Sequence, residues 1–190
     1  EDSFNTYGIL CNKKGVCQSY AYTVNLLSKK AGINSIMLTG YMSKTLPHAW
    51  NAIEYDGKWY WIDATNNGKS SGIPYLLYQT SSITAEDMDY ILDDGFELNS
   101  NLSYVVNVDD SKDWYVKTGL VANNEDELIE KLVSNMEKGK ISTVRYTFDL
   151  QLEDSFIIKL GKRILDKDSH ADLNAIKFGT AMNYFMMLYE

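Results

Sequence analysis

The first third of the chain carries, in order, three residues whose side chains could together perform acyl transfer: Cys17, His48 and Asp63. A thiolate attacks an amide carbonyl, an imidazole takes the thiol proton, and a carboxylate fixes the tautomer and orientation of that imidazole. Each residue also has a simpler interpretation. Most free cysteines are small buried hydrophobic residues, and an isolated His or Asp is usually a loop or strand-end residue. Which interpretation holds depends on whether the predicted helices and strands bring the three side chains together.

Cys17 falls at the start of a predicted helix over residues 16–31, which is followed by Gly32, where a helix commonly ends. In the first turn, unpaired backbone N–H groups and the helix dipole favour an anion, so the Cys17 thiolate would be stabilised. The backbone N–H of Cys17 is an expected donor to an oxyanion, and the sequence does not identify the second donor. Gln18 is a candidate for substrate contact, although its side chain should point in another direction along the helix. The apolar positions that predict the helix are Val16, Tyr20, Val24, Leu27 and Ala31.

A β-hairpin is the clearest local prediction. Two strands, Ala49 to Tyr55 and Lys58 to Ala64, are separated by Asp56-Gly57, one of the strongest short hairpin signals. A two-residue turn there fixes the register, because it sets Tyr55 opposite Lys58 and thereby pairs every residue before the turn with one after it.

In this register His48 and Asp63 point to the same face of the hairpin. Trp50 lies opposite Asp63, and His48 lies opposite Thr65. His48 and Asp63 then sit on a diagonal, roughly 7 to 8 Å apart at the backbone, where an imidazole and a carboxylate can meet. Trp50 would shield their contact from water, and core packing is an equally good and compatible role for it.

The remaining pattern predicts an α+β catalytic domain at residues 1–118 and a small α/β domain at residues 119–190. Residues 65–74 form a polar surface loop beside the strand ends. Further strands are expected at Ser35 to Tyr41, Leu102 to Val108, Trp114 to Lys117 and Ile141 to Phe148. Met182 to Tyr189 is compatible with a strand or a helix, and its crowding of Tyr, Phe and Leu favours a strand. Further helices are expected at Thr84 to Leu92, with Thr84 as the cap, at Glu125 to Lys138, closed by Gly139, and at Leu152 to Leu165.

Composition excludes several function classes. The 26 acidic residues exceed the 18 basic ones, and no cluster of Lys or Arg suits a phosphate backbone, so nucleic acid is not expected as a partner. No apolar run approaches the ~20 residues of a membrane span. The two cysteines, Cys11 and Cys17, are too few for a disulfide scaffold and are not spaced for zinc. The chain opens at Glu1 without an initiator Met, which suggests a processed product or part of something longer.

No metal or organic cofactor is expected. The acidic groups Asp93-Asp94 and Asp109-Asp110 with Asp113 do not follow the spacing of a calcium loop. A thiol nucleophile activated by an imidazole needs no cofactor. His170 lies outside any motif and is expected to be structural or exposed.

Several ordered blocks resemble the core of the transglutaminase-like superfamily over about residues 7–67. The blocks are Gly15-Val16-Cys17-Gln18-Ser19-Tyr20-Ala21, Ala31-Gly32-Ile33, Gly40, His48-Ala49-Trp50-Asn51 and Asp56-Gly57-Lys58-Trp59-Tyr60-Trp61-Ile62-Asp63-Ala64-Thr65. The resemblance implies that Cys17 is the nucleophile, His48 the general base and acid, and Asp63 the residue that orients His48. It also implies a papain-like core, in which the nucleophile helix packs on an antiparallel sheet that carries the other two groups.

Within the superfamily the flanking residues resemble bacterial proteins regarded as cysteine peptidases, many of them secreted or surface-bound. Animal crosslinking enzymes usually carry Trp directly after the catalytic Cys, where this chain has Gln18. Ser19 stands where the bacterial motif often has Gly. The segment from Trp114 into the Glu125 to Lys138 helix weakly resembles the extra C-terminal domain of such proteins.

The resemblance therefore implies a thiol-dependent hydrolase, a cysteine peptidase or amidase that acts on protein or cell-wall (peptidoglycan) peptide through a thioester. Two alternatives stay open. A crosslinking transglutaminase would use the same three residues but pass the acyl group to an amine. A non-catalytic surface or binding module could keep the fold without an assembled site.

Overall fold

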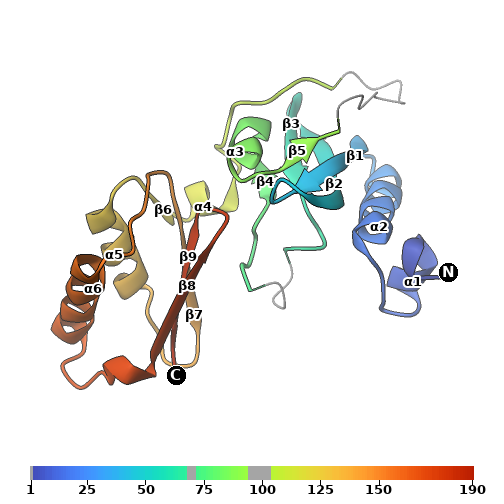
Figure 1. Cartoon of the computed structure of the whole chain (residues 1–190). Helices are drawn as coiled ribbons and strands as arrows, with labels where there is room; N and C mark the ends of the chain where they lie inside the picture. The colour runs from blue at the N-terminus through green and yellow to red at the C-terminus, as the bar shows by residue number, and fades with distance from the viewer. Residues whose placement is uncertain (1, 68–71, 94–103) are drawn as a thin grey trace. The chain divides into compact units, whose positions relative to one another are not determined.

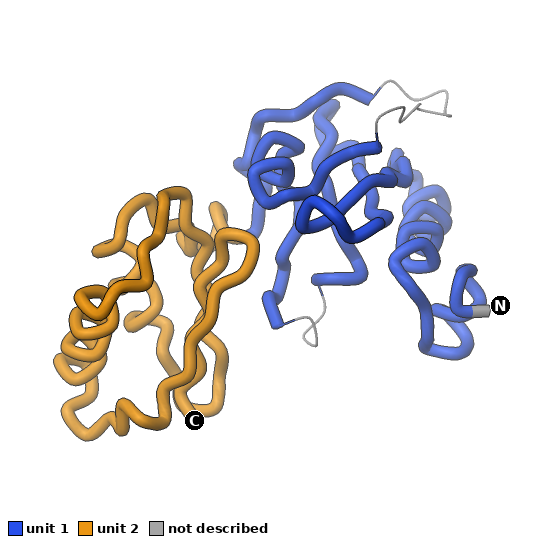
Figure 2. The backbone as a smooth tube through the Cα atoms, viewed as in Figure 1, with its two compact units in different colours: residues 1–114 blue, residues 115–190 orange. Residues whose placement is uncertain are grey.

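The computed structural model describes residues 2–67, 72–93 and 104–190. The chain divides into two compact units, residues 1–114 and 115–190 (Figure 2). Both units combine helices with a mainly antiparallel sheet, so the mixed α+β class is confirmed. The expected domains, 1–118 and 119–190, stay a prediction.

The first unit is built on a five-stranded sheet in the order β4-β3-β2-β1-β5, with every neighbouring pair antiparallel (Figure 1). The predicted hairpin is confirmed: Asp56 and Gly57 both have positive φ, 51° and 73°, as a type I′ turn requires. The register is also as predicted, from Tyr55↔Lys58 to Asn51↔Ile62. The strands are β1 (Ser35–Met42), β2 (Leu46–Tyr55), β3 (Lys58–Ile62), β4 (Tyr78–Thr80) and β5 (Ile91–Leu92).

Helix α2 (Cys17–Lys30) packs against β1 and β2. Its bounds agree with the predicted helix to within one residue at each end, but the predicted apolar face is wrong. The buried residues are the small Ser19, Ala21 and Thr23, whereas Val16 and Leu27 are exposed. Small side chains let the helix approach the sheet closely, so polar groups can join the two layers.

The junction between α2 and the sheet is polar. The Asn51 side chain on β2 donates to the Ala21 carbonyl at 3.1 Å and to Asn25 Oδ1 at 2.9 Å, and Ser35 Oγ on β1 donates to the same Asn25 oxygen at 2.6 Å. These bonds fix the position of the helix along the strand that carries His48.

The other elements of the first unit are short. They are a 3-10 turn, η1 (Asp2–Phe4), and two helices, α1 (Thr6–Leu10) and α3 (Ser82–Asp87). Three expectations are wrong here. The helix predicted to run to Leu92 ends at Asp87, and residues 91–92 form β5. Ser81, not Thr84, caps α3, because its side chain accepts from the Thr84 N–H at 3.1 Å. Residues 104–108 form no strand, and the first two residues of that predicted strand lie outside the described residues.

The second unit has a four-stranded sheet in the order β6-β7-β9-β8, parallel only between β6 and β7. Its elements are β6 (Val121–Ala122), α5 (Glu125–Ser134), β7 (Ile141–Tyr146), α6 (Asp154–Lys167), a 3-10 turn η3 (Leu173–Ala175), β8 (Ile176–Ala181) and β9 (Tyr184–Tyr189). Figure 1 shows both helices on one side of this sheet. The buried core joins them to β7 and β9 through Leu128, Leu132, Val144, Phe156, Leu160 and Phe185.

The strand predicted at Trp114 to Lys117 is wrong. These residues form a short helix, α4 (Trp114–Lys117). Their aromatic and β-branched side chains favour a strand, but Asp113 precedes them and Gly119, with φ of 71°, follows them. These flanking residues are typical of helix ends, and they outweigh four residues of strand propensity.

Candidate active site

Asp63 follows the last residue of β3 and is locked by its own backbone. Its N–H donates to the Leu77 carbonyl at 2.9 Å, and its carbonyl accepts from the N–H of Asn67 at 3.0 Å. The Asn67 side chain closes the loop, because it bonds both the carbonyl and the N–H of Leu77, at 2.7 and 3.0 Å. The start and end of the loop that follows Asp63 are therefore joined beside the carboxylate.

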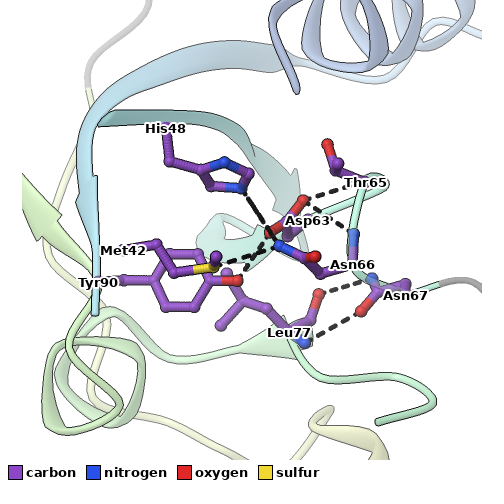
Figure 3. Close-up of polar contacts among 8 residues, drawn as sticks. All are labelled: Met42, His48, Asp63, Thr65, Asn66, Asn67, Leu77 and Tyr90. Atoms are coloured by element: carbon purple, nitrogen blue, oxygen red, sulfur yellow. Dashed lines mark hydrogen bonds and ion pairs between the residues drawn. The ribbon is translucent and has the colours of Figure 1, made fainter. Parts of the chain in front are cut away.

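His48 on β2 meets this carboxylate directly. The His48 Nε2 lies 2.7 Å from Asp63 Oδ2, and the two side chains are 5% and 0% exposed. Figure 3 shows the imidazole pointing to the carboxylate from the neighbouring strand. Within the described residues, the hydrogen bonds of the imidazole all use Nε2, and none uses Nδ1.

The Asp63 carboxylate receives further donors on both oxygens. Oδ2 accepts from the Tyr90 hydroxyl at 2.7 Å and from Asn66 Nδ2 at 2.8 Å, and Oδ1 accepts from the Thr65 N–H at 2.9 Å (Figure 3). Burial by itself raises the pKa of Asp63, but the bonds and charge of His48, with the bonds from Tyr90 and Asn66, outweigh it. The net effect is a pKa below the ordinary 3.8, so Asp63 is ionised at neutral pH.

Aromatic rings enclose the pair. Trp50, 1% exposed, stacks on His48 with ring centroids 6.1 Å apart, and Tyr90 packs edge-on against Trp50 at 5.3 Å. A dry enclosure strengthens the attraction between an imidazolium and a carboxylate. Trp50 is therefore a buried core residue that stacks on His48, and its role in shielding the His48 and Asp63 contact from water stays a prediction.

Cys17 is the first residue of α2 and is half-buried. The helix start is closed by Ser19, whose Oγ accepts from the Val16 N–H at 2.9 Å and donates to the Val16 carbonyl at 2.7 Å. Among the described residues, no hydrogen bond joins Cys17 to His48. The structure thus brings His48 and Asp63 together and places the Cys17 helix against the His48 strand.

The Gln18 side chain contacts a residue of its own helix: its Nε2 lies 3.4 Å from the Tyr22 hydroxyl on the exposed side of α2. Cys11 is exposed at the end of α1 rather than packed. His170 is also exposed and lies in the second unit. None of these three residues contacts the Asp63 carboxylate.

Two residues at the site were not predicted, Asn66 and Tyr90. Asn66 had a usable signal, because an Asp followed by Ala-Thr-Asn-Asn favours a turn in which the carboxylate accepts nearby N–H groups. Tyr90 had none, since it reaches Asp63 from a segment 27 residues further along the chain.

The acidic residues between 109 and 113 serve the fold. Asp109 pairs with Lys58 at 2.6 Å, Asp110 accepts from the Ser81 N–H at 2.8 Å, and Asp113 accepts from the Thr80 hydroxyl at 2.6 Å. The described ranges contain no group of three or more His, Cys, Asp or Glu side chains arranged to hold a metal ion. Nor do they contain a helix with the length and apolarity needed to cross a membrane.

Comparison with known families gives a match to one domain model, the core of the transglutaminase-like superfamily, over residues 3–64. This transglutaminase-like segment contains Cys17, His48 and Asp63, and it ends one residue after the buried carboxylate.

A solved structure, the crystal structure of a TGase, is 21% identical to the chain with a TM-score of 0.36. The similarity covers 67% of this chain and 33% of that one, so it spans about a third of that protein's length. No curated protein matches the chain.

Proposed function

We propose that the chain is a thiol-dependent acyl-transfer enzyme with a papain-like site, in which Cys17 is the nucleophile, His48 the base and Asp63 the orienting carboxylate. The observation that carries the proposal is the His48 and Asp63 contact. It is buried, it uses Nε2 of the imidazole, and it lies on the strand against which the Cys17 helix packs. A proton on Nε2 is then held by the carboxylate, which leaves Nδ1 as the basic nitrogen for a thiol.

The proposed reaction has two steps. The Cys17 sulfur attacks an amide carbonyl, its proton passes to His48, and the C–N bond breaks as His48 returns that proton to the leaving amine. His48 then takes a proton from an acceptor that attacks the thioester, and the proton passes back to the sulfur when the C–S bond breaks. The backbone N–H of Cys17 at the helix start supports the oxyanion in both steps.

The acceptor is water and the substrate is a protein or cell-wall peptide, which makes the enzyme a cysteine peptidase or amidase. Gln18 supports this choice, because it replaces the Trp that follows the catalytic Cys in animal crosslinking enzymes. By the same resemblance, the protein acts outside the cell or at its surface.

The buried charge argues for catalysis over a pure binding module. An ionised carboxylate removed from water costs several kcal/mol unless it is paired, and apolar residues of similar volume often serve stability as well. A module without chemistry has no need to keep Asp63 and His48 in this arrangement.

A library of peptide amides and peptidoglycan fragments tests the proposal. Intact protein should release new carboxyl termini and, after acid quenching, should show an acyl adduct on the peptide that contains Cys17 by mass spectrometry. Cys17→Ala should abolish both signals, and Cys11→Ala, the matched control, should leave them unchanged. Turnover that survives in Cys17→Ala would reject the proposed nucleophile.

A further inference from the structure

Tyr90 is a fully buried phenol whose hydroxyl is committed to the site. It is 0% exposed, and its oxygen lies 2.7 Å from Asp63 Oδ2, the same carboxylate oxygen that His48 contacts. A buried hydroxyl costs free energy unless it is hydrogen-bonded, so its partner shows where it contributes. One partner of Tyr90 is the proposed orienting carboxylate.

Tyr90 is positioned by β5, the edge strand that begins at the next residue. The two residues of β5 follow it directly, and Ile91 pairs with Tyr41 of β1. The pairing continues beyond the strand, because the Asp93 N–H donates to the Thr39 carbonyl at 3.1 Å. On its other side, the Tyr90 N–H donates to the Ala85 carbonyl at the end of α3 at 3.1 Å. Backbone hydrogen bonds therefore hold the chain at Tyr90 and just after it, which fixes the position from which the ring extends.

Gly40 on β1 makes this positioning possible. A Cβ at position 40 would lie 2.0 Å from the Ile91 carbonyl oxygen, so any larger residue would push β5 away from β1. Gly40 is one of the residues in the transglutaminase-like pattern. Gly40 leaves room for the backbone of β5, the strand that directly follows Tyr90.

The geometry around Oδ2 defines what the hydroxyl does. It is one of three donors on that oxygen, with His48 and Asn66, and together they prevent rotation of the carboxylate. A phenol that donates to the carboxylate stabilises the charged form, and the charged form is the one that holds the Nε2 proton.

We infer that Tyr90 is a positioning residue of the site: through Gly40 and β5 it holds Asp63 in the orientation that aligns His48. This inference rests on the proposed function. Tyr90 is buried beneath the carboxylate, so it acts on turnover and not on substrate binding.

The test compares Tyr90→Phe with Tyr60→Phe in the full chain. Tyr60 is a matched control, since it is 1% exposed and its hydroxyl also meets a carboxylate, Asp109 Oδ2 at 3.3 Å, away from the site. Tyr90→Phe should lower kcat about 10- to 100-fold, the loss expected for a hydrogen bond to a charged group, with KM unchanged. Tyr60→Phe should change neither constant. Equal kcat values for the two variants would overturn the inference.

A second measurement does not depend on turnover. The Asp63 carboxyl, followed by carbon-13 NMR, should titrate at a higher pH in Tyr90→Phe than in wild type, and Tyr60→Phe should leave it in place. An unchanged titration overturns the inference whatever the activity. A wild type that shows no Cys17-dependent turnover rejects the proposed function instead, and the titration still decides whether Tyr90 supports the Asp63 charge.

Gly40→Ala provides the same test if Tyr90→Phe does not fold. This variant keeps the Tyr90 hydroxyl but displaces β5. As in Tyr90→Phe, kcat should fall and the Asp63 carboxyl should titrate at a higher pH than in wild type. Wild-type values of both quantities in a folded Gly40→Ala variant would contradict the positioning of Tyr90 by β5.

Discussion

The most demanding residue of the first unit is Asp63, a carboxylate with no exposed surface. Its charge is balanced by His48 and by four further described donors, the Tyr90 hydroxyl, the Asn66 side-chain amide and the backbone N–H groups of Thr65 and Asn66. Because each donor stabilises the ionised form, these hydrogen bonds contribute less to the stability of the fold once the carboxylate is protonated. The stability of the folded chain should therefore depend on the ionisation of Asp63.

The pH dependence of stability follows from the lowered pKa of Asp63. Its folded pKa lies below 3.8, the ordinary value that applies to the unfolded chain, so ionised Asp63 contributes its full stability above that value. The contribution is lost as the pH falls from about 4 through the folded pKa. Asp63→Asn cannot lose it, because the amide does not titrate.

Thermal unfolding of wild type and Asp63→Asn at a series of pH values measures this effect. Other carboxylates with lowered pKa, such as Asp109, are common to both proteins and cancel in the comparison. The stability advantage of wild type over the variant should be constant from neutral pH to about 5 and shrink in more acidic solution. Parallel curves over the whole range would mean that folding does not lower the pKa of Asp63.

Cys17 should react faster than Cys11 with iodoacetamide near neutral pH. Accessibility alone predicts the reverse, since Cys11 is exposed and Cys17 is half-buried. Cys17 lies at the start of α2, where the helix dipole attracts an anion, and in the proposed site His48 serves as its base, whereas Cys11 caps the end of α1. Labelling resolved by mass spectrometry at several times gives the two rates, and a faster Cys11 would count against an activated nucleophile.

At the scale of elements, the sequence predicted best what local chemistry dictates. The Asp56-Gly57 turn set the hairpin register, and a helical spacing set the bounds of α2. The buried face of α2 could not be predicted from apolar periodicity, because the helix packs through Ser19, Ala21 and Thr23 and joins the sheet through side-chain amides. A hydrophobic pattern cannot reveal that a helix packs on a sheet through polar side chains.

The elements that were mispredicted or missed depend on distant partners. β5 has two residues and exists because Gly40 leaves room for its backbone, and β4 pairs with the end of β3. Neither has enough residues for a periodicity of its own. The contribution of Tyr90 to the site, which depends on the edge strand β5, could therefore not be predicted from the sequence.

Gly15→Ala should disturb the start of α2. A Cβ at position 15 would lie 2.2 Å from Ile9 Cδ1 and 2.3 Å from Ser19 Oγ, and Ser19 is bound in the cap of the helix. Displacing that hydroxyl should cost about 1 to 2 kcal/mol of unfolding free energy and slow the alkylation of Cys17.

Gly179→Ala is the control for this substitution, since a Cβ there meets no heavy atom within 4 Å. Chemical unfolding and iodoacetamide kinetics of the two variants give the comparison. A Gly15→Ala protein as stable and as reactive as Gly179→Ala would show that the helix start tolerates a side chain at position 15.

At the scale of the whole molecule, the polar network of the site belongs to one unit. Every described hydrogen-bond partner of Asp63 lies between residues 48 and 90, and Cys17 is in the same unit. The second unit has its own core, built on α5, α6 and its sheet. The chemistry proposed for the chain can therefore be argued from residues 1–114.

The fate of the thioester depends on what borders the nucleophile. A crosslinking enzyme must exclude water and admit an amine, which requires an apolar channel. Here Gln18 follows Cys17, and the segment that precedes His48, residues 43–47, is exposed throughout. On the other side of the hairpin, Thr65, Asn66 and Asn67 are polar and half-buried. We expect these segments to border the nucleophile, and their polar or exposed residues would leave a thioester accessible to water.

We therefore expect hydrolysis to exceed transfer to an amine. Water is far more concentrated than any dissolved amine, and an amine can compete only if the site binds and orients it. With a glutamine-containing peptide and a labelled primary amine at millimolar concentration, free glutamate should be the main product by mass spectrometry. Gln18→Trp, which restores the residue of the animal crosslinkers, should shift the ratio toward the adduct. Predominant amine adduct with the wild-type chain would make it a crosslinking transglutaminase.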